Sequence, residues 1–379
     1  MELRNYRSIE SARVDLAPFT LIVGPNGSGK SNFADALVFG RDVGIDAVTA
    51  IDRRGGIVGL RRWQRTKPCD VTVDIRISEK RGDLDRDYAR HQFTIHSGNA
   101  GRWSFRRELI EARAGGSLQF EISREGGTVK ASESVKFPMP RVRDTTSLML
   151  LVKQLGPFRR RPALARVHRV RLNPDAMRVP QVATENARLD ESGTNIATAF
   201  RKVANLQQAV VEPMKRIIPG LEDIAVEPIG RHLSLRFMQR QGGGQLAPFS
   251  AWEMSEGALR ALGILVAARQ MLRDELLIIE EPEVNVHPGA ARLVFEVLKD
   301  ASTRGAVLVT THSPDLLDAA RDEEILVCKY EDGVTRIGPL ADAQRDVIRD
   351  GLFSIAELMR SEPLRIAGES PSGMPGKLP

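Results

Sequence analysis

A glycine-rich segment near the N-terminus has the residue types and spacing of a phosphate-binding loop. Residues 24–31 read GPNGSGKS and fit the pattern G-x-x-x-x-G-K-[ST] in full. In such a loop the glycines let backbone N–H groups surround phosphate oxygens, and the lysine reaches the β- and γ-phosphates. The apolar residues before the segment and the helical pattern after it supply the strand and helix that the loop needs. We expect the nucleotide to be bound by Gly24, Pro25, Asn26, Gly27, Ser28, Gly29, Lys30, Ser31 and Asn32.

Two acids after a second apolar segment have the chemistry needed for metal binding and hydrolysis. Residues 276–288 read LLIIEEPEVNVHP, which predicts a buried strand with Glu280 and Glu281 at its carboxyl end, where ligands of open α/β sheets bind. We predict that Glu280 and the Ser31 hydroxyl hold Mg²⁺, and that Glu281 is the general base for the attacking water. Because Glu280 is one methylene longer than the Asp that is commoner at this position, we expect its contact to run through water. The simpler interpretation is a pair of exposed acids that ends a strand.

A histidine follows a third apolar segment. Residues 307–317 read VLVTTHSPDLL, so we expect His312 at a neighbouring strand end, beside the acids, where it senses or polarises the γ-phosphate. A lone histidine is as often structural as functional, and the two phosphate motifs favour the functional interpretation here. Lys30, Glu281 and His312 are therefore the predicted catalytic residues.

A fourth motif lies at the start of a predicted helix. Residues 254–262 read MSEGALRAL, with Ser255 and Gly257 at the helix N-terminus and Glu256 placed favourably for the helix dipole. Alone, this pattern indicates no more than a helix N-cap.

The rest of the chain must supply the elements that position these residues. Strands and helices alternate from residue 250 onward, which predicts a largely parallel core sheet. The earlier segment that begins with DVTVDIRIS (70–78) predicts an antiparallel β-meander. The helix after the phosphate loop is expected to stop at Gly40, with loop over residues 41–67. No heptad pattern is sustained, which excludes a long coiled coil.

Composition limits the classes of protein that remain. The 379 residues carry 55 Lys+Arg against 49 Asp+Glu, a mild basic excess that is compatible with nucleic acid as a partner. The two cysteines, Cys69 and Cys328, are far apart, which argues against a zinc site or a disulfide framework and fits a reducing cytoplasm. No apolar run approaches the length of a membrane span, of about 20 residues, and the N-terminus lacks a signal-peptide pattern. We therefore expect a soluble cytoplasmic protein that does not contact a membrane.

Taken together and in this order, the four motifs resemble those of ABC-type ATPases of the SMC, RecF and OLD type. The resemblance rests on GPNGSGKSN, MSEGALRAL, LIIEEPEVNVHP and TTHSPDLL, and LDESGTNIATAFRK (189–202) is similar to a segment of compact members. It implies an α/β fold of the P-loop NTPase class, with a largely parallel core sheet, an antiparallel β lobe and an inserted helical lobe.

The resemblance also implies how the chain is divided. We expect an N-terminal ATPase lobe over residues 1–139, an inserted mixed or helical lobe over 140–248, and a C-terminal ATPase lobe over 249–362. Residues 363–379, rich in Pro, Gly and Ser, are expected to be a disordered tail. The chain ends soon after the last expected ATPase strand, so we expect that any nuclease is a separate protein.

For the site, the resemblance implies ATP and Mg²⁺ as cofactors and a homodimer that sandwiches ATP. Ser255 and Gly257 of one copy would approach the γ-phosphate that is bound by the other. The signature departs from the LSGGQ of transporter subunits, because Glu256 replaces a glycine and Ala258 follows. No Q-loop glutamine can be assigned, although Gln64 is one candidate and Gln92 is another.

The output of such a switch has three candidate forms. Arginine clusters that include Arg159, Arg160, Arg161, Arg61 and Arg62 could follow a DNA backbone, although solvated faces and internal ion pairs explain them equally well. The first hypothesis is a dimeric ATPase that senses or clamps DNA in genome maintenance or antiphage defence, with a separate effector such as a nuclease. The second is a regulatory scaffold that gates an effector without touching DNA. The third, a transporter ATPase, is disfavoured by the signature and by the lack of membrane segments.

Overall fold

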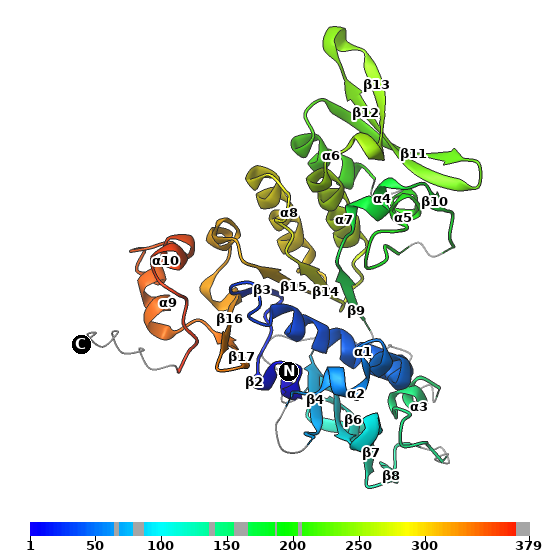
Figure 1. The fold of residues 1–379 in the computed structure, drawn as a ribbon, viewed down its shortest axis with the longest axis vertical. Helices are drawn as coiled ribbons and strands as arrows, with labels where there is room; N and C mark the ends of the chain where they lie inside the picture. Colours follow the sequence, from blue (N-terminus) through cyan, green and yellow to red (C-terminus); the bar gives the residue numbers. More distant parts are fainter. Residues whose placement is uncertain are drawn as a thin grey trace. The chain divides into compact units, whose positions relative to one another are not determined.

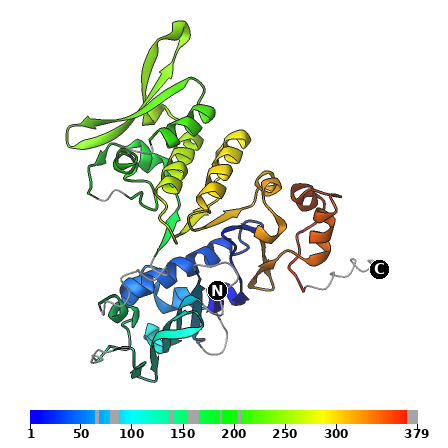
Figure 2. The ribbon, with the colours of Figure 1, turned by 180° about the vertical axis from the view of Figure 1, so that it is seen from behind.

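The protein forms two compact units. The structure is a computed structural model that describes residues 1–63, 68–78, 87–135, 141–154, 166–185, 188–203 and 207–368. The first unit consists of Met1–Leu16, Ile22–Val167 and Arg321–Pro379, and the second of Ala17–Leu21 and His168–Ala320. The chain therefore crosses between the units several times, and Figure 1 and Figure 2 follow its course from the blue N-terminus to the red C-terminus.

The first unit contains the predicted antiparallel β-meander. Its strands are β1 (Glu2–Tyr6), β2 (Ile9–Arg13), β4 (Val71–Ile77), β5 (Tyr88–Ser97), β6 (Trp103–Ala114), β7 (Ser117–Glu125), β8 (Thr128–Ala131), β16 (Ile325–Glu331) and β17 (Val334–Pro339). They lie in the order β8-β7-β6-β5-β4-β1-β2-β17-β16. Only the pairing of β17 with β2 is parallel among the pairings described within this unit.

The helix that follows the phosphate loop is longer than the sequence predicts. Helix α1 spans Lys30–Asp52 and changes direction at Asp46, whose φ of −156° is not helical, and α2 spans Gly56–Leu60. The expected stop at Gly40 is wrong. A Cβ at Gly40 would lie 2.4 Å from Cδ1 of Ile75 on β4, so the glycine allows α1 to pack closely on the sheet and does not end the helix.

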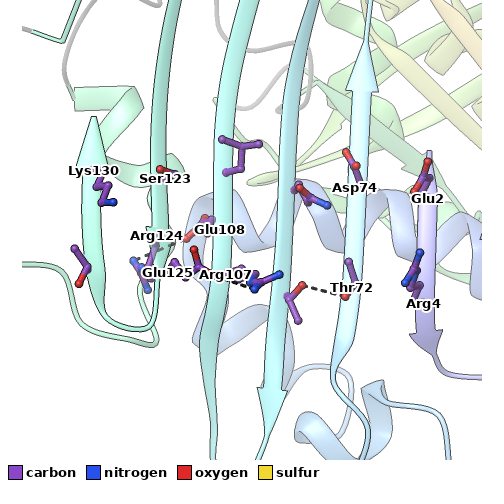
Figure 3. A pocket seen from close by; sticks show the side chains of 14 residues that line it. Glu2, Arg4, Thr72, Asp74, Arg107, Glu108, Ser123, Arg124, Glu125 and Lys130 are labelled. Atoms are coloured by element: carbon purple, nitrogen blue, oxygen red, sulfur yellow. Dashed lines mark hydrogen bonds and ion pairs between the residues drawn. The ribbon is translucent and has the colours of Figure 1, made fainter. Parts of the chain in front are cut away.

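One face of the meander is open and polar (Figure 3). Side chains of adjacent strands form rows across it, for example Glu2, Asp74, Gln92, Leu109, Ser123 and Lys130. The face is hollowed by a cavity of about 720 Å³, and an Arg107–Glu125 pair, with 2.8 Å between Nη2 and Oε1, bridges neighbouring strands. The opposite face packs on α1 through rings such as Phe39 and Phe93, whose centroids lie 5.8 Å apart. This alternation is typical of an antiparallel sheet with one solvated face.

The remaining elements of the first unit are short helices. Helix α3 (Met149–Gln154) packs on α1, where Gly44 lies against the side chain of Met149. Helices α9 (Asp342–Arg349) and α10 (Ile355–Ser361) lie near the C-terminus, and α10 begins with a capping box at Ser354.

The second unit carries the other predicted motifs. Its strands are β9 (Val167–Val170), which starts at the last residue of a first-unit segment, β10 (Gln181–Val182), β11 (Leu221–Ile229), β12 (His232–Arg240), β13 (Leu246–Ser250), β14 (Leu276–Glu280) and β15 (Ala306–Thr311). Strands β14 and β15 pair in parallel, from Leu276 beside Ala306 to Glu280 beside Thr310, and β9 flanks β14. The predicted strands at 276 and 307 and their parallel pairing are therefore confirmed.

Helices support this parallel pair. The helices of the second unit are α4 (Pro174–Arg178), α5 (Ile196–Lys202), α6 (Gln208–Ile217), α7 (Glu256–Gln270) and α8 (Pro288–Ala301). Helix α7 is buried along most of its length. It packs against α8, which lies beside it in both ribbon views (Figure 1, Figure 2). The N-terminal residues of β3 (Phe19–Val23) belong to this unit, where the rings of Phe19 and Phe295 meet edge to face at 4.9 Å.

Candidate active site

The phosphate loop is shaped by glycines that touch the neighbouring strands. Gly27 and Gly29 have φ of 79° and 103°, in the left-handed region that favours glycine. A Cβ at Gly29 would lie 2.1 Å from Oγ1 of Thr335 on β17, and a Cβ at Gly24 would lie 2.1 Å from the carbonyl oxygen of Cys328 on β16. Both positions therefore exclude any side chain, because the hairpin of β16 and β17 forms the floor of the loop.

Hydrogen bonds from this floor fix the loop further. Thr335 is fully buried, and its hydroxyl donates to the Ser28 carbonyl at 2.8 Å while it bonds Ser8 Oγ at 2.7 Å. The amide of Asn32 donates to the same Ser8 hydroxyl at 2.6 Å. Burial raises the pKa of the Cys328 thiol, which also donates to the Ser28 carbonyl, at 3.4 Å. Ser8, Cys328 and Thr335 are distant from the loop in sequence, and the motifs do not include Ser8 or Thr335.

Lys30 and the start of α1 fit an anionic ligand. The buried Lys30 ammonium donates to the carbonyls of Gly24 and Pro25, at 2.8 and 3.1 Å, which holds it inside the curve of the loop. The helix begins directly after Gly29, with no side-chain cap and no acid in its first turn. Its N-terminal N–H groups and dipole are thus suited to phosphate oxygens, as the sequence predicts.

A buried charge cluster anchors α1 behind the loop. Asp35 accepts hydrogen bonds from Tyr6 Oη at 2.6 Å and from both Nε and Nη2 of Arg54, and Arg7 Nη2 lies 3.1 Å from its Oδ2. Burial, the largest influence, would raise the pKa of this carboxyl, but the hydrogen bonds and charge of Arg54, with Tyr6 and Arg7, lower it overall. Asp35 is therefore held ionised. Its partners come from β1, the turn after β1 and the turn after α1.

The acids of the second unit lie around the end of β14. Glu280 is the last residue of β14, and Glu281 follows with a φ of 47°, its N–H bonded to the Thr310 carbonyl at 2.9 Å. His312 Nδ1 lies 3.8 Å from Glu281 Oε1. The structure thus brings His312 and Glu281 together, as the motifs predict.

Glu283 is a site residue that the sequence motifs do not predict. Its Oε1 accepts hydrogen bonds from Thr311 Oγ1 at 2.6 Å and from the backbone N–H of His312 at 3.2 Å, and His312 Nδ1 lies 3.5 Å from the same oxygen. The carboxylate therefore ties the loop after β14 to the end of β15. Its place in the EEPE sequence, two residues beyond the predicted base, was the only available signal.

The signature segment is locked to the loop after β14. Ser255 caps α7, since its hydroxyl accepts from Ala258 N at 3.2 Å. A Cβ at Gly257 would lie 2.1 Å from the Asn285 carbonyl, and the Asn285 amide donates to Glu256 Oε2 at 2.7 Å. Glu256, which departs from the transporter signature, thus has a specific partner. Helix α4 adds a further contact, a hydrogen bond of 3.2 Å from Arg178 Nη2 to the Met254 carbonyl.

A hollow lies beside the signature. It has a volume of about 350 Å³ and is lined in part by Ser255, Gly257, Asn285 and His287. His287 caps α8, with Nδ1 accepting from Gly289 N at 3.2 Å. The exposed Ser255 at the predicted helix N-terminus therefore borders a recess whose lining is partly polar and mostly apolar.

The oxygen ligands suit Mg²⁺ that arrives with a nucleotide. A carboxylate such as Glu280 and a hydroxyl such as Ser31 are hard ligands, which Mg²⁺ prefers. Among the residues that the structure describes, no group of three His, Cys, Asp or Glu side chains is gathered as a preformed metal site.

Several predicted residues lie apart from these motifs. Arg159, Arg160, Arg161 and Gln64 fall outside the described residues. Arg62 forms an ion pair with Glu10, with 2.9 Å between Nη1 and Oε1. Arg61 is half-buried, and its backbone forms an isolated antiparallel β-bridge with that of Tyr6. Gln92 lies on the polar face of the meander, where Arg90 Nη2 donates to it at 3.2 Å.

Comparisons with known proteins agree with the geometry of these motifs. Residues 155–318 match a family model described as "AAA domain, putative AbiEii toxin, Type IV TA system", and residues 1–54 match one described as "AAA ATPase domain". The OLD nuclease of Thermus scotoductus is 23% identical over 347 residues, which cover 87% of this chain and 62% of that protein. The chromosome partition protein Smc of Methanocaldococcus jannaschii is 52% identical over 40 residues, which cover 10% of this chain and 3% of that protein.

Solved structures show the same fold. An SMC head bound to the C-terminal winged-helix domain of ScpA aligns with a TM-score of 0.58 at 15% identity, over 90% of this chain and 98% of that one. A head domain with an extended coiled coil, bound to the C-terminal domain of ScpA derived from Pyrococcus furiosus, aligns with a TM-score of 0.54 at 14% identity, over 93% and 98%. The P-loop NTPase fold that the motifs imply is confirmed. Within the described residues, no helix combines the length and the hydropathy that a membrane crossing requires.

Proposed function

Since the chain belongs to the SMC/RecF/OLD-like group of ABC-type ATPases, we propose that it binds and hydrolyses ATP as a dimeric switch. The observation that carries the proposal is the phosphate loop, whose glycines at positions 24 and 29 are imposed by β16 and β17. A loop packed in this way presents backbone N–H groups and Lys30 to a triphosphate.

The second unit supplies the hydrolytic groups of the proposed reaction. Glu281 accepts the proton of the attacking water, and His312, held by Glu283, reports on or polarises the γ-phosphate. Glu280 and Ser31 would hold Mg²⁺, which would supply positive charge beside the phosphates when it is bound with the nucleotide.

A second copy completes the proposed site. Ser255 and Gly257 begin α7, where N–H groups and the helix dipole favour an anion, and the recess beside them is accessible. We propose that this helix start approaches the γ-phosphate held by the partner copy. A ligand that needs both surfaces stabilises the dimer, and its hydrolysis releases the dimer.

The proposed output is the sensing or clamping of DNA, in genome maintenance or antiphage defence, with a separate effector. This chain spans 62% of the length of the OLD nuclease that it matches, and nuclease activity is a property of that protein. The DNA contacts would fall to Arg159, Arg160 and Arg161.

A regulatory scaffold without DNA contact is the second candidate. This candidate is favoured because two of the described arginines already form ion pairs within the protein, Arg54 with Asp35 and Arg62 with Glu10. DNA binding titrated with salt separates the two, because phosphate contacts weaken steeply as salt rises. If the wild type binds no DNA even at low salt, the scaffold is the better account.

The ATPase proposal is tested by Lys30→Ala. We expect the wild type to release phosphate from ATP with Mg²⁺, and the variant to lose nucleotide binding in calorimetry by about 100-fold or more. Arg201→Gln, an exposed change on α5, serves as the control. Unchanged binding in the Lys30 variant would rule out the assignment of the phosphate loop.

A further inference from the structure

The proposed metal-holding acid has a cationic neighbour that no motif predicts. Arg169 lies on β9, which flanks β14, and its Nε is 3.7 Å from Glu280 Oε1. Both side chains are largely buried, with 17% and 9% exposed. At this separation the two charges attract, although the contact is longer than a hydrogen bond.

A second acid holds the guanidinium more tightly. Arg169 Nε donates to Glu191 Oε1 at 2.6 Å, and its Nη2 pairs with the same oxygen. Arg169 is therefore shared between two carboxylates, with the hydrogen bond made to Glu191 and the ion pair made to Glu280.

The backbone that carries Glu191 is itself fixed. Asp190 Oδ1 accepts from the N–H groups of Ser192, Gly193 and Thr194, at 3.1, 2.6 and 2.9 Å. The Glu191 carbonyl accepts from Arg171 N at 2.7 Å, directly beyond β9. This is the LDESGTN segment, which the proposed function leaves without a role. Its fold places Glu191 at a constant position beside Arg169.

From this geometry we propose that Glu191 restrains Arg169, and that Arg169 sets the metal affinity of Glu280. Arg169 is a positioning residue that acts through Glu280. It compensates the buried carboxylate before the metal arrives, while Glu191 keeps the guanidinium from closing on Glu280 and excluding a divalent cation. The inference rests on the proposed function, in which Glu280 holds Mg²⁺.

The two partners of this pair have opposite predicted effects. Glu191→Gln frees Arg169 to bond Glu280 directly, so divalent-metal affinity should fall by about tenfold. Arg169→Gln removes the competing charge, so metal affinity should rise several-fold. The double variant should have the same metal affinity as Arg169→Gln, because Glu191 acts only through the arginine.

The test is binding of Mn²⁺ to the full chain saturated with ADP, followed by the electron paramagnetic resonance signal of free Mn²⁺. The Mg²⁺ concentration for half-maximal hydrolysis should shift in the same directions, with a smaller change in kcat. Arg201→Gln is the matched control, an exposed arginine in the same unit. ADP affinity measured without metal should not change in any variant, which separates the effect from loss of folding.

Two results would overturn the inference in distinguishable ways. If Glu280→Gln weakens Mn²⁺ binding while Glu191→Gln and Arg169→Gln shift it in the same direction or not at all, the positioning role fails and the metal assignment stands. If Glu280→Gln leaves Mn²⁺ binding unchanged, the metal assignment fails and the inference fails with it.

Discussion

The phosphate loop of the first unit and the acids of the second unit are positioned in different ways. The loop is held mainly by close packing of its own main chain, with Gly29 against the Thr335 side chain and Gly24 against the Cys328 carbonyl. Hydrogen bonds to the Ser28 carbonyl add to this packing. The acids are held by side chains, with Glu283 on Thr311 and His312. Main-chain packing accepts no side chain at the contact, whereas a side-chain network tolerates graded change. Substitutions in the two regions should therefore differ in the size of their effects and in the property that they change.

The largest expected effect is on the stability of the protein, when the buried charge of Asp35 that anchors α1 is removed. This variant tests whether the first unit also depends on side-chain interactions. Asp35→Asn removes the charge that Arg54 and Arg7 share and leaves Arg54 with Asp42, at 3.1 Å, as its remaining described acid. The side chains of Asp35 and Arg54 are only 8% and 7% exposed. We expect the free energy of unfolding to fall by about 3 kcal/mol at pH 7. Urea denaturation measures it, with the exposed Asp52→Asn as the control.

The same variant has a defined pH dependence. The pKa of Asp35 is lowered from its ordinary 3.8, so its stabilising contribution is complete above that value and is lost as the pH falls through the lowered pKa. The difference in stability between wild type and variant should thus shrink below about pH 4. A difference that stayed constant from pH 7 to pH 3 would contradict the ionised state of Asp35 in the folded protein.

The next effect tests main-chain packing in the loop itself. Gly29→Ala and Gly27→Ala both put alanine at positive φ, but only the first places a Cβ against another residue, 2.1 Å from Thr335 Oγ1. Positive φ alone costs about 1–2 kcal/mol. We expect ATP affinity to fall about 100-fold for Gly29→Ala and less than tenfold for Gly27→Ala. Equal losses in calorimetry would mean that the floor of the loop is not what selects glycine.

A smaller, graded effect is expected in the second unit. Glu283→Gln keeps an oxygen for Thr311 and the His312 N–H and removes the charge that faces the His312 ring. We expect kcat for ATP to fall about tenfold, with nucleotide affinity within about twofold, because charge-assisted hydrogen bonds are roughly twice as strong as neutral ones. Glu296→Gln, an exposed change on α8, is the control. If Glu283→Gln lowered nucleotide affinity and left kcat unchanged, the second unit would not differ from the phosphate loop in the property that it controls.

The difference between local packing and contacts with distant side chains also explains which features could be predicted from the sequence. The loop is one contiguous motif, and Glu280, Glu281 and His312 follow apolar segments whose strands are readable, so their elements were predicted correctly. Gly40 was misread because a glycine in a helical pattern marks either a stop or a close contact, and the contact with Ile75 is visible only in the folded chain.

Residues that act through distant partners left no local signal. The short β9, VHRV, has two polar residues between two valines and so lacks the alternation of a strand, and it is defined as a core strand only by its place beside β14. The sequence around Arg169 and Arg178 therefore gives no sign of their partners, although one contacts Glu280 and the other bonds to the Met254 carbonyl. Their roles depend on pairing across the chain, which periodicity does not encode.

The most direct test of the ATP-gated dimer is the mass of Glu281→Gln in solution, measured by light scattering. Without the predicted base, ATP should bind and persist, so we expect ATP with Mg²⁺ to double the mass and ADP to leave it unchanged. Adding Lys30→Ala to the same chain should abolish the change. A Glu281→Gln protein that binds ATP and stays monomeric would rule out the ATP-gated dimer.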